Sequence, residues 1–287
     1  MIIIRFRGGL GNQLFQYAIY RSYQLHGKNV KADISSYLYD EKRQFTLDLF
    51  PNVKLNKVDT TQMLCILERY KKRSKTEKII NRIIPMTDIM FVEKDDGDFC
   101  TQLLSLDNKI VDGYFQDVRY FQAYKEIIRS ELQFPHKEPK LQNIIDKINN
   151  QEFSVSIHVR RGDYLQLNDI YGNICTLDYY RQAIEMMKQK CGKELYWYIM
   201  SDDIGWAENN LPLQNATYIT RDMFDTHQDW YDMAIMSTCK HHILANSSFS
   251  WWGAFLNDNG SNIVIRPEKW NQYSNKTGLT LPNWITI

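Results

Sequence analysis

Residues 1–33 read MIIIRFRGGLGNQLFQYAIYRSYQLHGKNVKAD and give the first clear indication of fold class. Ile2–Phe6 is a short, largely apolar strand candidate, and the glycines of residues 8–11 interrupt it. A helix candidate follows at Asn12–His26, because its apolar residues recur on one face: Phe15, Ala18, Ile19 and Leu25. Val30–Asp33 is a second strand candidate. Strand, loop, helix and strand in this order predict parallel strands and an α/β fold.

A second alternation of strands and helices occupies the C-terminal half. Its strand candidates are Ser154–Val159, Leu195–Met200, His241–Ala245 and Ile263–Arg266. Helical patterns separate the first three of them, at Tyr179–Cys191 and Trp230–Cys239. Phe134–Pro139 lies between the halves and has the composition of a linker. We therefore predict two facing Rossmann-like lobes, residues 1–135 and 136–287, with a ligand cleft between them.

Charge and cysteine content exclude several classes of function. The chain carries 35 Lys and Arg against 34 Asp and Glu, a net charge of +1, so no overall field favours a nucleic acid. Any anion site must be local. The five cysteines are odd in number and never form a CxxC pair, which argues against a disulfide framework or a zinc site.

The N-terminus lacks the long apolar stretch of a signal peptide, and no run of about 18 apolar residues occurs. These features predict a soluble, cytoplasmic protein. Residues 60–85 form a helical, basic segment whose charges fit a solvated face over a packed one. Peripheral docking of this segment on the anionic inner face of the cell membrane is the alternative interpretation.

The sharpest motif is His158-Val-Arg160-Arg161-Gly-Asp163, where the strand candidate 154–159 ends. Two adjacent arginines can aim forked, permanently charged donors at a diphosphate, while Asp163 orients one of them. The alternative is a buried arginine–aspartate pair that only ties the strand end to a loop.

A second element, residues 245–255, joins an apolar strand to an apolar helix. Ser247 or Ser248 can cap this helix, and the N–H groups of its first turn form an anion site that needs no metal. Ordinary capping is the alternative, but two phosphate-suited elements that end strands of one lobe favour a shared phosphate site. The candidate contacts here are Asn246, Ser247, Ser248, Phe249 and Ser250. The tryptophans at 251 and 252 are predicted to be core.

Two further polar elements lie at strand ends. Ser201 and Asp202 are candidates to meet a ribose or a leaving diphosphate, and a turn with solvated acids is the alternative for Ser201-Asp202-Asp203. The Gly8–Gln13 stretch opens the first helix but is not a full G-x-G-x-x-G fingerprint, so its glycines also fit a simple tight turn.

Taken together, four ordered blocks resemble the α-1,2-fucosyltransferases of glycosyltransferase family eleven in their bacterial form. The blocks are Arg7–Tyr17, Asp112–Gln116, His158–Tyr164 and Asp232 through Phe255. The resemblance spans roughly residues 1–50 and 111–266, and nothing in Leu55–Lys109 takes part in it.

This resemblance implies a GT-B fold, GDP-fucose as donor, inversion at the anomeric carbon and no required metal or other cofactor. It implies an acceptor with a terminal galactose, on an oligosaccharide or a lipid-linked glycan, that receives fucose on O2. The N-terminal lobe would be the acceptor side and the C-terminal lobe the donor side.

Individual roles also follow from the resemblance. Arg160 and Arg161 are expected at the diphosphate, where they supply the main catalytic effect, and His158 near the nucleoside. Asp232 is expected to contact guanine. Asn12 is expected to contact the acceptor or leaving group. The general base stays open between Asp33, Asp117 and other acids.

Two rival functions remain at this stage. A metal-dependent glycosyltransferase of other donor specificity is suggested by Asp96-Gly-Asp98 and Asp202-Asp203, since paired carboxylates can hold Mg²⁺ or Mn²⁺ beneath a diphosphate. A non-enzymatic carbohydrate-binding protein is suggested by the 13% aromatic content. An Arg-Arg-Gly-Asp strand end has no evident use in such a protein.

Overall fold

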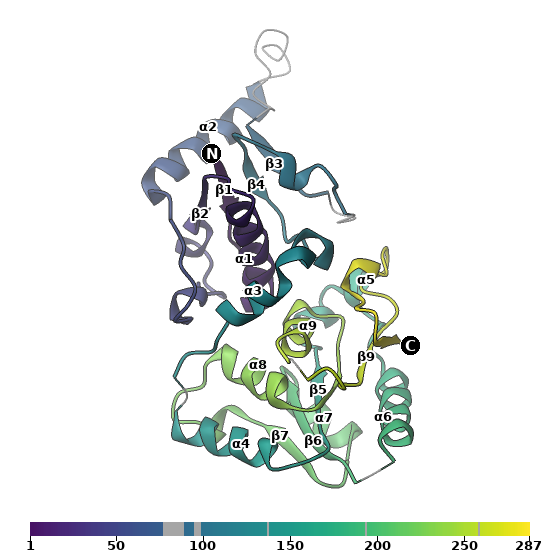
Figure 1. Cartoon of the computed structure of the whole chain (residues 1–287). Coiled ribbons are helices and arrows are strands. Elements are labelled where there is room, and N and C mark those ends of the chain that lie inside the picture. The colour runs from purple at the N-terminus through teal and green to yellow at the C-terminus, as the bar shows by residue number, and fades with distance from the viewer. Residues whose placement is uncertain (77–88, 95–98, 137, 193, 258) are drawn as a thin grey trace. The chain divides into compact units, whose positions relative to one another are not determined.

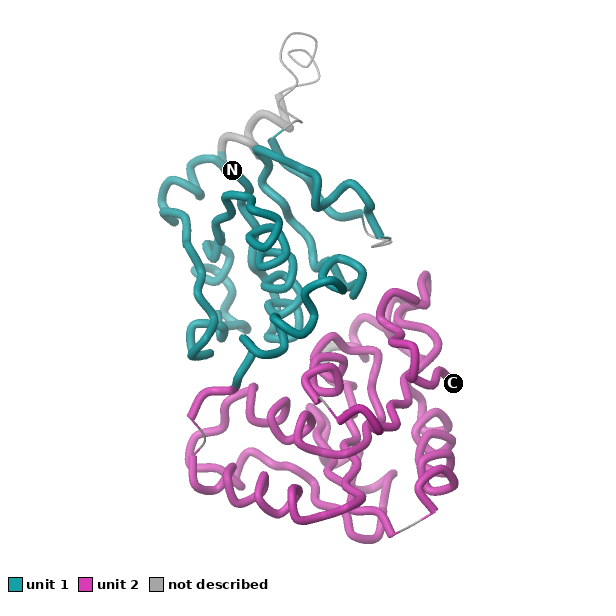
Figure 2. Tube along the Cα trace, viewed as in Figure 1, with its two compact units in different colours: residues 1–133 teal, residues 134–287 magenta. Residues whose placement is uncertain are grey.

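A computed structural model describes residues 1–76, 89–94, 99–136, 138–192, 194–257 and 259–287. Within these ranges it gives only the backbone of residues 69–76 and 163. The chain divides into two compact units, Met1–Gln133 and Phe134–Ile287, which Figure 2 distinguishes by colour. This division lies two residues before the boundary expected from the sequence.

Unit 1 is built on a parallel sheet with the strand order β2-β1-β4-β3 (Figure 1). Its strands are β1 Ile2–Arg5, β2 Val30–Asp33, β3 Met90–Val92 and β4 Ile110–Asp112. Its α-helices are α1 Leu10–Leu25, α2 Thr60–Thr76 and α3 Lys125–Glu131. Short 3₁₀ turns occupy Ser35–Leu38, Leu47–Leu49, Leu103–Ser105, Val118–Tyr120 and Gln122–Tyr124. All three strand pairings are parallel, so the predicted α/β class is confirmed for this unit.

Helix α1 begins two residues earlier than the sequence indicates. Gly8 has a φ of +82°, a left-handed conformation that glycine adopts without a Cβ penalty, and Gly9 is the N-cap. Gly11 therefore lies inside the helix instead of in the loop. The middle and C-terminal part of α1 is bound to α3, since Glu131 accepts hydrogen bonds from the Tyr17 hydroxyl at 2.7 Å and from Arg21 Nε at 2.8 Å.

Unit 2 is built on a larger parallel sheet with the order β10-β9-β8-β5-β6-β7. Its strands are β5 Ser154–Val159, β6 Tyr196–Ser201, β7 Ala216–Ile219, β8 His241–Ile243, β9 Val264–Arg266 and β10 Trp284–Thr286. Its α-helices are α4 Pro139–Asn149, α5 Asn168–Tyr171, α6 Leu177–Cys191, α7 Ile204–Asn210, α8 Asp229–Thr238 and α9 Ser248–Phe255. Three 3₁₀ turns lie at Asp163–Leu165, Arg221–Met223 and Thr277–Leu279.

Strand β5 shows how the sequence alternation sorts the two faces of this sheet. Its six residues are all buried, as expected for a parallel strand covered on both sides. Val155, Ile157 and Val159 pack into an apolar core with residues of α6 and α7. The alternate residues, Ser154, Ser156 and His158, belong to the opposite face. Thus His158 is placed on the α9 side, where its ring lies 5.6 Å from that of Phe249.

Several sequence-based expectations are refined by the structure. Strands β3, β4, β7 and β10 were not expected from the sequence. Trp251 and Trp252 are fully buried, as predicted. The five cysteines are free. The basic segment 60–85 is helical to Thr76, but residues 77–88 and the side chains of its basic residues lie outside the described part of the chain.

Across the described ranges, no helix combines the length and apolar character needed to cross a membrane.

Candidate functional site

Three of the elements singled out in the sequence follow adjacent strands of unit 2. Strands β8, β5 and β6 are neighbours in the sheet, and parallel strands end at the same edge. The Arg160–Gly162 turn follows β5, Asp202 and Asp203 follow β6, and Ser247 precedes α9 shortly after β8. The structure therefore brings the arginine pair, the acidic pair and the serine cap to one edge, the usual ligand-binding edge of an α/β sheet.

Asp202 holds the arginine turn through both of its carboxylate oxygens. Oδ2 lies 2.9 Å from Arg160 Nη1, and Oδ1 accepts a hydrogen bond from the Arg161 backbone N–H at 2.8 Å. A Cβ at Gly162 would lie 2.8 Å from Oδ2, so glycine is the residue that leaves room for this carboxylate. Asp202 thus fixes the backbone of the turn and the direction of one guanidinium.

Asp203 holds the second arginine in a similar way. Its Oδ2 accepts a hydrogen bond from Arg161 Nε at 3.2 Å, and its Oδ1 caps α7 by accepting from the Trp206 N–H at 3.2 Å. The Arg161 guanidinium also lies over the Trp206 ring, 4.3 Å from its centroid. Ser201 stabilises this loop, since its Oγ accepts from the Asp203 N–H at 2.9 Å.

The tie between a strand end and a loop, one of the two interpretations of the motif, is therefore present, and the acids described for it come from the loop after β6. The side chain of Asp163, the expected partner, lies outside the described part of the molecule. Arg160 and Arg161 keep 23% and 25% of their side-chain surface exposed. Because a guanidinium has five N–H donors, each arginine can bind a further anion while its aspartate holds it.

His158 is nearly buried and has an unusual environment. Its Nδ1 is buried without a hydrogen-bond partner among the described residues. Burial, followed by the positive charge of Arg160, lowers the pKa of His158 to about 4. The imidazole is therefore neutral at pH 7 and adds no charge to the arginine pair.

In the segment 246–250, some side chains keep exposed surface and others are buried and hydrogen-bonded inside the protein. Ser247 is the N-cap of α9, and its Oγ accepts from the Phe249 N–H at 3.3 Å. Asn246 is buried, and its Nδ2 donates to the carbonyl of Trp270 at 3.1 Å. Ser250 is also buried and donates to the Ser247 carbonyl at 3.1 Å. Ser248 and Phe249 are half-buried and are the better-placed side chains, because Asn246, Ser247 and Ser250 are buried and engaged inside the protein.

Asp232 lies on α8, in its first turn. Its carboxylate oxygen is 3.2 Å from His227 Nε2, and its side chain is 24% exposed. Burial raises the pKa of Asp232, and the hydrogen bond with His227 opposes that shift. A partly exposed carboxylate of this kind can accept hydrogen bonds from a ligand.

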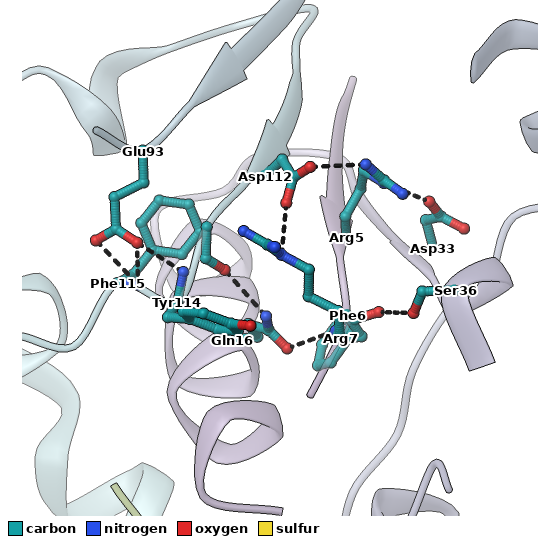
Figure 3. A network of polar contacts seen from close by, with 11 residues as sticks. Arg5, Phe6, Arg7, Gln16, Asp33, Ser36, Glu93, Asp112, Tyr114 and Phe115 are labelled. Carbon is teal, nitrogen blue, oxygen red and sulfur yellow. Dashed lines mark hydrogen bonds and ion pairs between the residues drawn. The ribbon is translucent and has the colours of Figure 1, made fainter. Parts of the chain in front are cut away.

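Unit 1 carries its own polar network at the carboxyl edge of its sheet (Figure 3). Arg5 lies between two acids, with Nε 3.1 Å from Asp33 Oδ2 and Nη1 2.6 Å from Asp112 Oδ2. Arg7 Nε forms a second ion pair with Asp112 Oδ1 at 3.0 Å. Arg5, Arg7 and Asp112 were not assigned a role from the sequence. The available signal was a charged residue at or just after the end of a strand.

The other unit 1 candidates have defined positions. Asn12 lies in the first turns of α1, and its Oδ1 accepts from Gln116 Nε2 at 2.9 Å. Asp33 and Asp117 are 1% and 4% exposed, and Asp117 is paired with Arg119. Neither carboxylate is accessible to an acceptor hydroxyl in this structure, so neither fits the role of general base.

The carboxylates of the metal-dependent alternative have other partners or are not described. Asp202 and Asp203 pair with the arginines, whereas Asp96 and Asp98 lie outside the described residues. Within the described ranges, no group of three or more His, Cys, Asp or Glu side chains could hold a metal ion.

Comparison with solved structures defines the fold. The structure of the NodZ α-1,6-fucosyltransferase co-crystallized with GDP is similar over 89% of this chain and 92% of that one, with a TM-score of 0.53 and 17% sequence identity. Two parallel α/β sheets with this similarity define a GT-B-like fold, as the resemblance implied.

Comparison of sequences defines the family. The profile of Glycosyl transferase family 11 matches residues 1–287. The O-antigen biosynthesis glycosyltransferase WbnK of Escherichia coli is 31% identical over 98% of both chains. An α-1,2-colitosyltransferase of Escherichia coli is 30% identical over 94% of this chain and 92% of its own. The chain belongs to glycosyl transferase family 11, and the family expected from the four sequence blocks is confirmed.

Proposed function

We propose that this protein is an inverting galactoside α-1,2-fucosyltransferase that uses GDP-fucose without a metal ion. The observation that carries this proposal is the Arg160–Arg161 turn, fixed by Asp202 and Asp203 beside the N-terminus of α9. Family membership supports sugar transfer, and the α-1,2 linkage in the name of one relative supports the regiochemistry. The galactose acceptor follows the resemblance found in the sequence.

The chemistry of inverting transfer fits this edge. An acceptor hydroxyl attacks C1 of fucose while GDP leaves from the opposite face, so negative charge grows on the β-phosphate. Two oriented guanidinium groups and the N–H groups of a helix N-terminus stabilise such charge. Because Asp202 and Asp203 hold both arginines before the ligand binds, little reorganisation is needed when that charge develops.

The remaining donor contacts are assigned by position. We place the diphosphate against Arg160, Arg161 and the serine cap at Ser247 and Ser248, with neutral His158 and Phe249 toward the nucleoside. Asp232 is the proposed acceptor for the guanine N–H groups. Ser201 and Asp202 contribute by shaping the turn, since both are engaged with neighbouring loop groups.

The first test is calorimetric titration of the protein with GDP in EDTA, with UDP as control, on wild type and Arg160→Ala. We expect metal-independent binding of GDP and at least a tenfold weaker affinity in the variant. Turnover of GDP-fucose with lactose should fall by a factor on the order of 10²–10³, the usual effect of removing one preorganised donor. Binding that requires a divalent ion would instead favour the metal-dependent alternative.

The donor sugar is tested in the same assay. Colitose is the 3-deoxy analogue of fucose, and the colitosyltransferase among the relatives makes GDP-colitose the relevant competitor. We expect GDP-fucose to give the higher kcat/KM. Preference for GDP-colitose would keep the diphosphate site but change the donor assignment.

A further inference from the structure

The segment that leads into helix α8 packs three rings into one group. The imidazole of His227 lies 5.7 Å from the Phe224 ring and 6.0 Å from the Tyr231 ring, measured between ring centres. The Phe224 and Tyr231 rings are themselves 5.1 Å apart. Both are buried, and the His227 side chain is 13% exposed. Because the imidazole contacts both rings, the packing of this segment sets its orientation.

The imidazole also contacts the carboxylate of Asp232. His227 Nε2 lies 3.2 Å from Asp232 Oδ1, and the nitrogen is the donor because an ionised carboxylate can only accept. Such a carboxylate has about four acceptor positions on its two oxygens, and His227 takes one of them. The Asp232 side chain keeps 24% of its surface exposed. His227 therefore fixes the direction of a carboxylate that can still accept from a ligand.

The charges around Asp232 show a second effect of His227. Burial raises the pKa of Asp232, and the negative charge of Asp229, at the start of α8, adds to this shift. The hydrogen bond from His227 is the largest influence that lowers the pKa, and the positive charge of Arg221 contributes less. His227 consequently favours the ionised carboxylate, the form that accepts hydrogen bonds without donating one.

A guanine base offers donors that match such a carboxylate. Its ring N1–H and its exocyclic amino group lie side by side, so one ionised carboxylate can accept from both. Hypoxanthine keeps the N1–H and lacks the amino group, and uracil has a single N–H between two carbonyls. A site built around a pair of charge-assisted hydrogen bonds rejects a base that lacks one of the donors. Base selection therefore depends on the direction and the ionisation of the carboxylate.

We propose that His227 is a positioning residue for base selection, which holds Asp232 so that its carboxylate accepts both N–H donors of guanine. The inference rests on the proposed function for the contact between Asp232 and guanine. His227 itself precedes the block Asp232 through Phe255 and has no role in the family resemblance. It acts through Asp232 and need not touch the nucleotide.

The test separates the hydrogen bond of His227 from its packing. His227→Phe keeps a ring beside Phe224 and Tyr231 but removes the donor. His227→Gln removes the ring but keeps an N–H donor at the position of Nε2. The control is His136→Ala, which truncates an exposed histidine in the linker before α4. Each protein is titrated calorimetrically, in EDTA, with GDP, inosine diphosphate (IDP) and UDP.

The preference for GDP over IDP should follow the donor and not the ring. We expect wild type to bind GDP about tenfold or more tightly than IDP, because IDP lacks the second donor. In His227→Phe the GDP affinity should fall about tenfold and the IDP affinity at most about threefold. His227→Gln should keep most of the preference, and His136→Ala should match wild type.

The contrary outcomes are distinct for the two proposals. An unchanged preference for GDP over IDP in His227→Phe, or equal losses of GDP and IDP affinity, would overturn the role of His227. A preference that survives in His227→Phe but is lost in His227→Gln would do the same, since the ring alone would then matter. Wild type that binds UDP as tightly as GDP would contradict the donor of the proposed function itself. Thermal melts by circular dichroism identify a variant that has lost its fold, and His227→Ala then replaces it.

Discussion

Each unit places two arginines and two aspartates at the carboxyl edge of a parallel sheet, but the two quartets are paired differently. In unit 1, Arg5 lies between Asp33 and Asp112, which end the strands on either side of β1. In unit 2, Arg160 and Arg161 each have an aspartate of their own, and both aspartates come from the loop after β6.

The exposed fraction of the aspartate side chains also differs between the two units. The unit 1 aspartates retain 1% and 12% of their side-chain surface, against 24% and 38% for Asp202 and Asp203. In unit 1, the shared and mostly buried charges link three strands. Removing one of them leaves an opposite charge buried without a partner. Separately paired, partly exposed arginines keep donors for a ligand. The same four residue types thus support the fold in one unit and prepare a binding site in the other.

The largest predicted difference between the units is in their stability at acid pH. Burial lowers the pKa of His158 to about 4 and that of His242 to about 3, whereas the one histidine of unit 1, His26, is exposed. The unfolded chain takes up these protons near pH 6.5, so the stability of unit 2 is fully present above that pH and falls as pH decreases toward 4. The loss is on the order of 3 kcal/mol per histidine. His241, whose pKa burial also lowers, adds to this trend, and Asp232, with its raised pKa, opposes it.

The measurement uses the seven tryptophans, which all lie in residues 197–284 and therefore report on unit 2. The urea midpoint followed by tryptophan fluorescence should decrease between pH 6.5 and pH 4. Hydrogen exchange of the β1 and β4 amides, read by mass spectrometry, should change less over the same range. A fluorescence midpoint that does not depend on pH would refute this difference.

Asp112→Asn should be the next largest effect, on stability. Asp112 neutralises both Arg5 and Arg7 and is nearly buried, so its replacement should cost about 2–3 kcal/mol, somewhat below a fully buried pair because Arg7 is partly exposed. Urea unfolding monitored by circular dichroism measures this cost. GDP affinity should remain within twofold at a temperature where the variant is folded. A free-energy change below about 0.5 kcal/mol would show that the unit 1 quartet does not cross-link the sheet.

Asp202→Asn should lower activity and leave stability nearly unchanged, the opposite of Asp112→Asn. The expected change in free energy is also smaller. The amide oxygen can still accept the Arg161 N–H bond, but the charge that orients Arg160 is lost. We expect kcat/KM for GDP-fucose to fall about tenfold, equivalent to about 1.4 kcal/mol, with a nearly unchanged melting temperature.

A double-mutant cycle on GDP affinity sharpens this prediction. If Asp202 acts through Arg160, Asp202→Asn should have little further effect in the Arg160→Ala background. Additive losses would mean that Asp202 contacts the donor directly, as expected from its position at a strand end in the sequence.

The sequence predicts the strand that carries the arginines, but it does not indicate that acids from the loop after β6 hold them. Strand β5 has the predicted bounds, because six alternating residues between clear loop signals define it. Asp163 was expected to orient an arginine since it is close in sequence. The observed acids are about 40 residues away and meet the arginines only because β6 is the neighbour of β5, a strand order that periodicity does not encode.

Residue type alone also does not show whether a polar side chain faces a ligand or the protein interior. Asn246 and Ser250 are small polar residues beside a helix start, yet their side chains satisfy carbonyl groups of the protein interior. The unit 1 network, in contrast, was not predicted. Asp112 ends β4, a strand of three residues that was not predicted either. Its pairing with Arg5 and Arg7 became visible only in three dimensions.

The hydrogen bonds of Glu93 bear on how this enzyme could change its specificity. Glu93 directly follows β3 and clamps the turn that contains Tyr114 and Phe115. The preceding segment, residues 55–89, joins β2 to this anchor and carries none of the blocks that define the family resemblance. Its helix α2 is more than a surface loop, since Met63 and Leu67 pack with Ile3 and Ile110 in the core of unit 1. A change of specificity through this segment therefore has to keep the apolar face of α2, while one carboxylate preserves the geometry of the turn beyond it.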